Sequence, residues 1–255
     1  MRESFVIEER VIDRAMASYP EVNELVAFST PVVSFGYPKG ARVATVGINP
    51  SSSEFQIGNG NRDPLGEFES KRLVDTETLG IHNPKNLNRE QAIKVIEGCY
   101  DYFSGANANP YEWFKRLEKY VLEPAGHTYY GENPSACHLD LVQWATDPVW
   151  DSIKDKSIKK KLLEADKEFL RFQLTNYDFE VVYLNGGTVL KQFKALGIAD
   201  LSVVHQVTRN SMGGTHDVVT GYANGTTYFG WGINASSRDA NKKGLEELSQ
   251  WIKSQ

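Results

Sequence analysis

An asparagine at position 49 stands in a turn that ends a short apolar run. The run, Val43–Val46, stops at Gly47, and Pro50 and Ser51 follow the asparagine directly. A short apolar run that glycine and proline break off predicts a buried strand with an abrupt end. The pattern therefore predicts an amide side chain, that of Asn49, at the carboxyl end of a strand, where open α/β sheets bind ligands.

A second turn of the same kind lies near the other end of the chain. Gly232-Ile233-Asn234 closes an apolar segment and continues into Ala235-Ser236-Ser237-Arg238. Each Gly-Ile-Asn turn follows a predicted strand. We therefore expect two loops that meet over one site.

Composition places the chain among ordinary globular proteins. It has 255 residues, of which 40% are hydrophobic and 24% charged, a length that suits one large α/β domain or two small ones. There is no run of the roughly 20 apolar residues that a membrane span needs, and no signal-peptide pattern at the N-terminus. With two distant cysteines, Cys99 and Cys137, we expect a cytoplasmic protein with reduced thiols. The net charge of -5 disfavours indiscriminate nucleic-acid binding but leaves room for a local basic face.

Apolar runs alternate with helical patterns along the chain. Strands are predicted at 43–47, 136–142, 179–184 and 226–231, and helices at 5–18, 89–103, 110–123, 152–173, 189–196 and 237–252. This alternation predicts a three-layer α/β/α sandwich with a central, mainly parallel, four-stranded sheet. A β-hairpin at about 203–222 is expected as an insertion. Without a repeat or a linker, residues 1–255 are predicted to form a single domain.

Three segments in this order resemble the uracil-DNA glycosylase superfamily. Gly47-Ile48-Asn49-Pro50 fits the first motif of that superfamily and looks most like its mismatch-specific and single-strand-selective branches. Asn234-Ala235-Ser236-Ser237-Arg238 is similar to the second motif, with alanine in place of proline. Between them, Ala136-Cys137-His138-Leu139-Asp140-Leu141 looks like the strand that ends in the base-reading residue. The resemblance covers about 45–250, most of the chain.

The resemblance implies a monofunctional DNA glycosylase, which hydrolyses the N-glycosidic bond of a pyrimidine flipped into a pocket. Asn49 would position the attacking water through its amide oxygen. Asn234 would donate to a base oxygen as negative charge grows there. No lysine stands at a motif position suited to a Schiff base, so the expected product is an abasic site without strand cleavage.

The same resemblance assigns the binding residues. The residues expected to bind the base are Gly47, Ile48, Pro50, Ser51, Phe55 and Asp140. Phe55 is the stacking candidate, with Tyr129, Tyr130, Trp144 and Phe68 as rivals. Ser236, Ser237 and Arg238 would hold DNA and open the last helix, whose N-terminal amides favour phosphate. The expected partner is single- or double-stranded DNA, with no membrane, no obligatory protein partner, no metal and no organic cofactor.

Asp140 departs from the superfamily, which usually has asparagine at this position. An asparagine can both accept from uracil N3–H and donate to O4, whereas an ionised carboxylate only accepts. A carboxylate suits the exocyclic amine of cytosine instead. Because removal of ordinary cytosine would damage the host genome, the predicted substrate is a modified cytosine, such as those in some phage DNA, and the predicted role is antiviral defence.

Each motif also has a structural interpretation. Asn49 and Asn234 are residue types that cap helices and form turns, and Asp140 can pair with a basic neighbour. His138, His205 and His216 lack metal-ligand spacing and suit core or surface positions. The alternative functions are a uracil-DNA repair glycosylase, a non-catalytic binder of modified nucleotides with the same fold, and a nucleotide hydrolase on a similar sheet.

Overall fold

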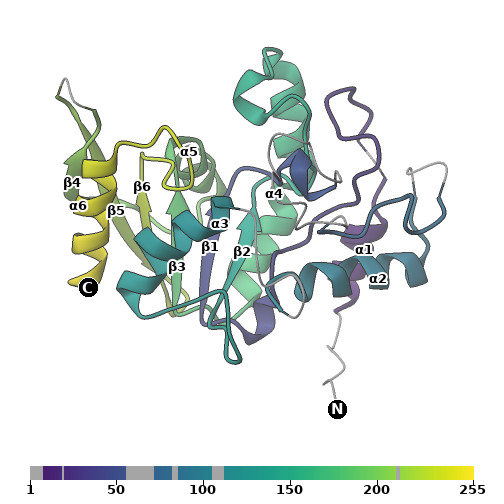
Figure 1. Cartoon of the computed structure of the whole chain (residues 1–255), viewed down its shortest axis with the longest axis horizontal. Helices are drawn as coiled ribbons and strands as arrows, with labels where there is room; N and C mark the ends of the chain where they lie inside the picture. The colour runs from purple at the N-terminus through teal and green to yellow at the C-terminus, as the bar shows by residue number, and fades with distance from the viewer. Residues whose placement is uncertain (1–7, 19, 56–71, 82–85, 105–111, 211–212) are drawn as a thin grey trace, which may run out of the picture.

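The computed structural model describes residues 8–18, 20–55, 72–81, 86–104, 112–210 and 213–255 (Figure 1). Most of the segment 55–88, for which the sequence predicts an irregular path, and the stacking candidate Phe68 lie outside the described residues.

The centre of the molecule is a six-stranded mixed sheet with strand order β2-β1-β3-β6-β5-β4. Its strands are β1 (Val43–Gly47), β2 (Ala136–Asp140), β3 (Val181–Asn185), β4 (Ser202–Thr208), β5 (Thr215–Ala223) and β6 (Thr226–Trp231). Strand β1 is parallel to β2 and β3, and β3 is parallel to β6, while β5 is antiparallel to both β4 and β6. The carboxyl ends of β1, β2, β3 and β6 therefore meet at one edge.

The predicted α/β class is confirmed, but the sheet has six strands instead of the predicted four, because the predicted inserted hairpin is part of it. Strands β4 and β5 form the hairpin at the predicted place, and β5 pairs with β6 from Val218↔Trp231 to Ala223↔Thr226. The hairpin therefore extends the central sheet. A pattern of apolar residues shows where a strand lies but not which strand it pairs with.

Helices pack on both faces of the sheet. The α-helices of the described residues are α1 (Glu9–Met16), α2 (Arg89–Tyr100), α3 (Glu112–Leu117), α4 (Lys156–Asn176), α5 (Gly187–Leu196) and α6 (Lys242–Lys253). Figure 1 shows α3 and α6 on one side of the sheet and α4 and α5 on the other. Successive strand residues face opposite sides, so Tyr183 joins the core under α3 and α6, whereas Val182 and Leu184 join the core under α4 and α5. None of the helices in the described part of the chain is both long and apolar enough to cross a bilayer.

Helix α6 begins later than the sequence pattern indicates. The prediction that Ser236, Ser237 and Arg238 open this helix is wrong, because it starts at Lys242. The cap is Asn241, whose side chain accepts a hydrogen bond from the Lys243 amide at 2.9 Å. The residues 234–241 form a separate loop between β6 and α6.

The loops after β1 and β2 continue side by side beyond the sheet. The Leu141 amide donates to the Gly47 carbonyl at 3.1 Å, and the Val142 amide donates to the Ile48 carbonyl at 2.9 Å. Farther on, Ser51 forms an isolated parallel bridge with Thr146. This pairing brings Asn49 next to the loop that follows Asp140.

Candidate functional site

A pocket of about 210 Å³ opens at the carboxyl edge of the parallel strands. Its lining combines loop residues after β1, the ends of β2 and β3, and the loop after β6: Gly47, Ile48, Asn49, Pro50, Ser51, Ser52, Glu54, His138, Asp140, Thr146, Val149, Asp151, Asn185 and Asn234, together with the aromatic residues Phe35, Trp113, Phe114 and Trp150. The structure thus brings Asn49, Asp140 and Asn234 to one pocket.

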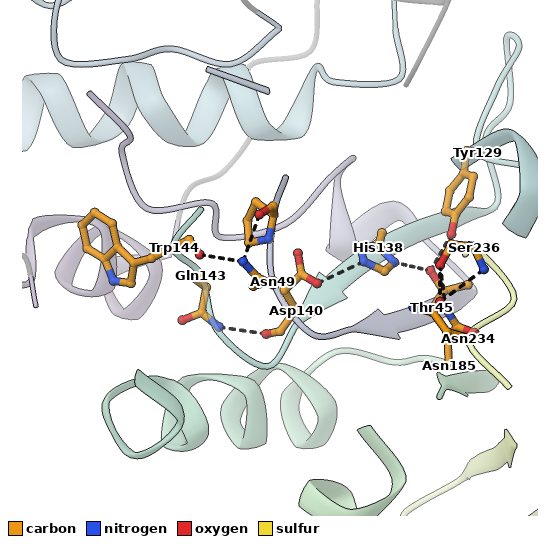
Figure 2. A network of polar contacts seen from close by, with 11 residues as sticks. Thr45, Asn49, Tyr129, His138, Asp140, Gln143, Trp144, Asn185, Asn234 and Ser236 are labelled. Carbon is orange, nitrogen blue, oxygen red and sulfur yellow. Dashed lines mark hydrogen bonds and ion pairs between the residues drawn. The ribbon is translucent and has the colours of Figure 1, made fainter. Parts of the chain in front are cut away.

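The amide of Asn49 is held in one orientation. Its Nδ2 donates to the Trp144 carbonyl at 3.3 Å (Figure 2). It also donates to the Pro50 carbonyl at 3.0 Å and to Thr146 Oγ1 at 3.1 Å. Carbonyl oxygens only accept, so the nitrogen must face them. The other amide atom, Oδ1, accepts no hydrogen bond from the described residues and is left as an acceptor for a ligand in the pocket.

The amide of Asn234 is held the opposite way round. Its Oδ1 accepts from Asn185 Nδ2 at 3.1 Å, from Ser236 Oγ at 2.7 Å and from the Ser236 amide at 3.3 Å. With the oxygen fully engaged, Nδ2 has no acceptor among the described residues and remains as a donor. Asn234 is exposed at the pocket, so this donor is accessible to a ligand.

Asn185 at the end of β3 fixes the loop that holds Asn234. Its Nδ2 also donates to Ser236 Oγ at 2.9 Å, and its Oδ1 accepts from the Ala235 amide at 2.8 Å and from Trp231 Nε1 at 3.2 Å. The side chain is buried, and its four hydrogen bonds tie β3, β6 and the following loop together. Such a fully satisfied buried network keeps the loop in a single conformation.

Asp140 and His138 occupy the end of β2 against β1. His138 Nε2 lies 3.3 Å from Asp140 Oδ1, and both side chains are buried. A Cβ at Gly47 would lie 2.7 Å from Asp140 Oδ1 and 2.8 Å from His138 Nε2. Only glycine at this register position leaves room for the two polar side chains.

Glu54 adds a second buried carboxyl group to the pocket wall, beside Asp140. It ends the short helical turn Ser52–Glu54 and is buried, and Tyr102 Oη donates to its Oε2 at 2.8 Å. Burial raises the pKa of Glu54 to about 7, and the nearby negative charge of Asp140 contributes to the increase, while Arg72 and the Tyr102 hydroxyl act against it. At neutral pH this group is poised between the acid and the carboxylate.

Aromatic side chains wall the pocket, although the predicted stacking residue is not among them. Phe55 packs in the hydrophobic core and does not line the pocket. Trp113 and Phe114 line the pocket instead, and their ring centroids lie 4.8 and 5.3 Å from that of the His138 ring. The backbone after Glu54 turns Phe55 away from the pocket and into the core.

The residues predicted to hold DNA differ in accessibility. Ser236 is buried and its hydroxyl is occupied by Asn234 and Asn185. Ser237 is half-buried and Arg238 is exposed, and none of the three lines the pocket. Ser236 therefore supports the shape of the loop, and the other two remain the accessible side chains. Among the described residues, no cluster of three or more histidine, cysteine, aspartate or glutamate side chains is arranged to hold a metal.

Sequence reasoning missed Glu54, Trp113 and Trp150 as pocket residues, and it assigned His138 no part in the site. A signal for Glu54 was present, because it lies in the loop that Asn49 begins. Asn185 offered another: it is a third asparagine at the end of a predicted strand.

No protein-family model matches this chain, and no curated protein sequence matches it.

Proposed function

We propose that the protein is a monofunctional DNA glycosylase that removes a modified cytosine from DNA. The observation that supports this best is the opposed orientation of two amides on one pocket. Asn49 offers an acceptor, because backbone carbonyls hold its nitrogen. Asn234 offers a donor, because its oxygen accepts from the Ser236 amide and from Asn185 Nδ2, and the Ala235 amide fixes Asn185 in that orientation. Hydrolysis of a glycosidic bond needs an acceptor for the attacking water and a donor for the departing base.

In this reaction water adds to C1′ of the sugar as the bond from C1′ to the base nitrogen breaks. The electron pair of that bond leaves with the base, and the proton released by water neutralises the base through solvent. Asn49 Oδ1 accepts a hydrogen bond from the water and directs its lone pair at C1′. Asn234 Nδ2 donates to the base oxygen on which negative charge develops. The products are the free base and an abasic site.

Asp140 supports a base with an exocyclic amine. A carboxylate accepts the amine hydrogen of a cytosine but repels the O4 oxygen of uracil. Removal of unmodified cytosine would be lethal to the host genome, so the proposed substrate has a modified cytosine of the kind that foreign DNA contains. The corresponding role is defence in the cytoplasm.

The size of the pocket and the charges around it agree with a flipped nucleotide. The volume of about 210 Å³ is below the roughly 300–1,000 Å³ of sites for drug-sized ligands and suits one base. Lys159 Nζ lies 5.6 Å from the ring of Trp150, which lines the pocket. Arg116 Nε donates to the carbonyl of Ala235, next to Asn234, at 3.4 Å. These two cations provide local attraction for phosphates despite the net charge of -5.

The test is a panel of DNAs that contain uracil, modified cytosines or only ordinary bases, incubated with the protein and treated with alkali to reveal abasic sites. We expect cleavage of a modified-cytosine DNA that is lost in Asn49→Ala and retained in Asn176→Ala, a change at an exposed asparagine on α4. Strong uracil release without action on any cytosine derivative would reject the substrate. Tight DNA binding without product would favour the non-catalytic binder, and faster turnover of free nucleosides would favour a nucleotide hydrolase.

A further inference from the structure

We propose that His138 is a positioning residue for Asp140. A buried hydrogen-bond chain from Tyr129 through Thr45 fixes His138 as a neutral donor to Asp140, and this holds the carboxylate as an acceptor for an exocyclic amine. The statement about base selection rests on the proposed glycosylase function. The statement about the histidine does not.

The chain consists of three contacts between fully buried or almost fully buried groups. Tyr129 Oη lies 2.5 Å from Thr45 Oγ1, Thr45 Oγ1 lies 2.6 Å from His138 Nδ1, and His138 Nε2 lies 3.3 Å from Asp140 Oδ1 (Figure 2). Thr45, Tyr129 and His138 are each 0% exposed, and Asp140 is 4% exposed. Bulk water therefore does not reach the first three groups. Each must find its hydrogen-bond partner among the neighbouring protein groups.

The direction of the chain follows from the hydroxyl of Tyr129. Within the described part of the protein, Thr45 Oγ1 is the partner of this hydroxyl, so the phenol can satisfy its hydrogen only by donating to Thr45. Thr45 then donates its own hydrogen to His138 Nδ1, which must be the unprotonated nitrogen. The ring proton of His138 is consequently on Nε2 and points at Asp140 Oδ1.

The opposite direction is unfavourable. If His138 Nδ1 carried a proton, it would donate to Thr45 Oγ1. Either the phenol hydrogen of Tyr129 or the hydroxyl hydrogen of Thr45 would then be buried without an acceptor among the described residues, which costs more free energy than a hydrogen bond gains. The same argument disfavours the imidazolium form, since that form donates from both nitrogens.

The surroundings of His138 reinforce this assignment. Its ring is enclosed by Phe35, Trp113 and Phe114, with centroid distances of 5.8, 4.8 and 5.3 Å. These side chains offer the ring nitrogens no alternative acceptor, and the low dielectric strengthens the existing hydrogen bonds. The Nε2 proton thus holds Oδ1 of Asp140. Oδ2, which accepts from none of the described residues, is left to accept from a ligand in the pocket.

The histidine is tested first without any substrate. Nitrogen-15 NMR of the full chain at neutral pH should show His138 as the neutral ring with the proton on Nε2. A ring protonated on Nδ1, or on both nitrogens, would overturn the assignment whether or not the protein has glycosylase activity.

The effect on base selection is tested with a matched pair of variants. His138→Gln places an amide nitrogen where Nε2 lies and retains the donor to Asp140, whereas His138→Asn places it where Nδ1 lies, within reach of Thr45 but not of Asp140. We expect His138→Gln to keep the preference for a modified cytosine over uracil. In His138→Asn that preference should fall by about tenfold or more, the discrimination that one good base contact provides.

The NMR measurement and the base preference of the variants test the state of His138 and its effect on base selection separately. If the wild-type protein forms no abasic sites in any DNA, the proposed function fails, and the NMR result still decides the state of His138. If the wild-type protein is active and both variants keep the same preference, His138 does not position Asp140. Circular dichroism of both variants confirms that they are folded before the rates are compared.

Discussion

The two Gly-Ile-Asn turns have the same local sequence but present opposite atoms of their asparagines. At Asn49 the nitrogen is consumed by carbonyls of its own loop and of the loop after β2, so the oxygen faces the pocket. At Asn234 the oxygen is consumed by Asn185 and Ser236, so the nitrogen, which has no acceptor in the described part of the protein, faces the pocket. An amide at a strand end therefore acquires its chemical role from partners that lie far away in the sequence.

The largest effect is expected when the acceptor at Asn49 is removed. Asn49→Ala should reduce the single-turnover rate of abasic-site formation by roughly 10³-fold or more, a part of the roughly 7–11 kcal/mol that ideal positioning provides. DNA affinity should change little, since the lost interaction is with water. Asn176→Ala serves as the control. A rate close to that of the wild type in Asn49→Ala would show that this acceptor does not hold the water.

The second test replaces the donor of Asn234 with an acceptor and leaves the loop intact. Asn234→Asp keeps the oxygen that Asn185 and Ser236 bind, but it replaces the donor in the pocket with a second oxygen. The rate should fall by about 10²–10³-fold, the cost of losing one donor at a developing oxyanion. The melting temperature should stay near that of the wild type. If activity is retained, Asn234 does not donate to the base.

The third test concerns Glu54, which shares the pocket wall with Asp140. Its pKa is raised from 4.5 to about 7 by burial, so the folded state binds more protons than the unfolded state between these two values. The stability of the wild type should therefore decline as pH rises through this window. Glu54→Gln keeps an acceptor for Tyr102 and has no charge to bury. Its stability relative to the wild type should grow by about 3 kcal/mol between pH 4 and pH 8.

Urea denaturation of both proteins across that range measures the difference. A constant difference between the two proteins would mean that Glu54 titrates normally in the folded state. Glu118→Gln is the control for a buried carboxyl group outside the pocket. Burial also raises the pKa of Glu118, but Glu118 does not line the pocket.

Glu54 also shows what the sequence could and could not reveal. The short apolar runs predicted each strand to within a few residues, and the parallel arrangement of strands predicted that Asn49, Asp140 and Asn234 meet at one edge. The chemistry around them depends on distant partners. The buried position of Glu54 depends on Tyr102, 48 residues away, and the state of His138 depends on Thr45 and Tyr129. No local pattern encodes these contacts, and the start of α6 was misplaced because several residues near it are equally good caps.

The smallest expected effect separates support of the Asn234 loop from contact with DNA. Ser236→Ala removes a hydroxyl that donates to Asn234 and accepts from Asn185, and it should cost about 1 kcal/mol of stability. The rate should fall by up to about tenfold as Asn234 loosens, with no change in how DNA affinity depends on salt. Arg238→Ala should change DNA affinity instead of the rate. It should reduce the salt slope, which is the slope of log affinity against log salt concentration, by about one without altering the chemical step. Because a phosphate contact and a loop support change different quantities, a lower salt slope in Ser236→Ala would show that the loop held by this serine also places a cation on a phosphate, so that support of the loop and contact with DNA are not separate.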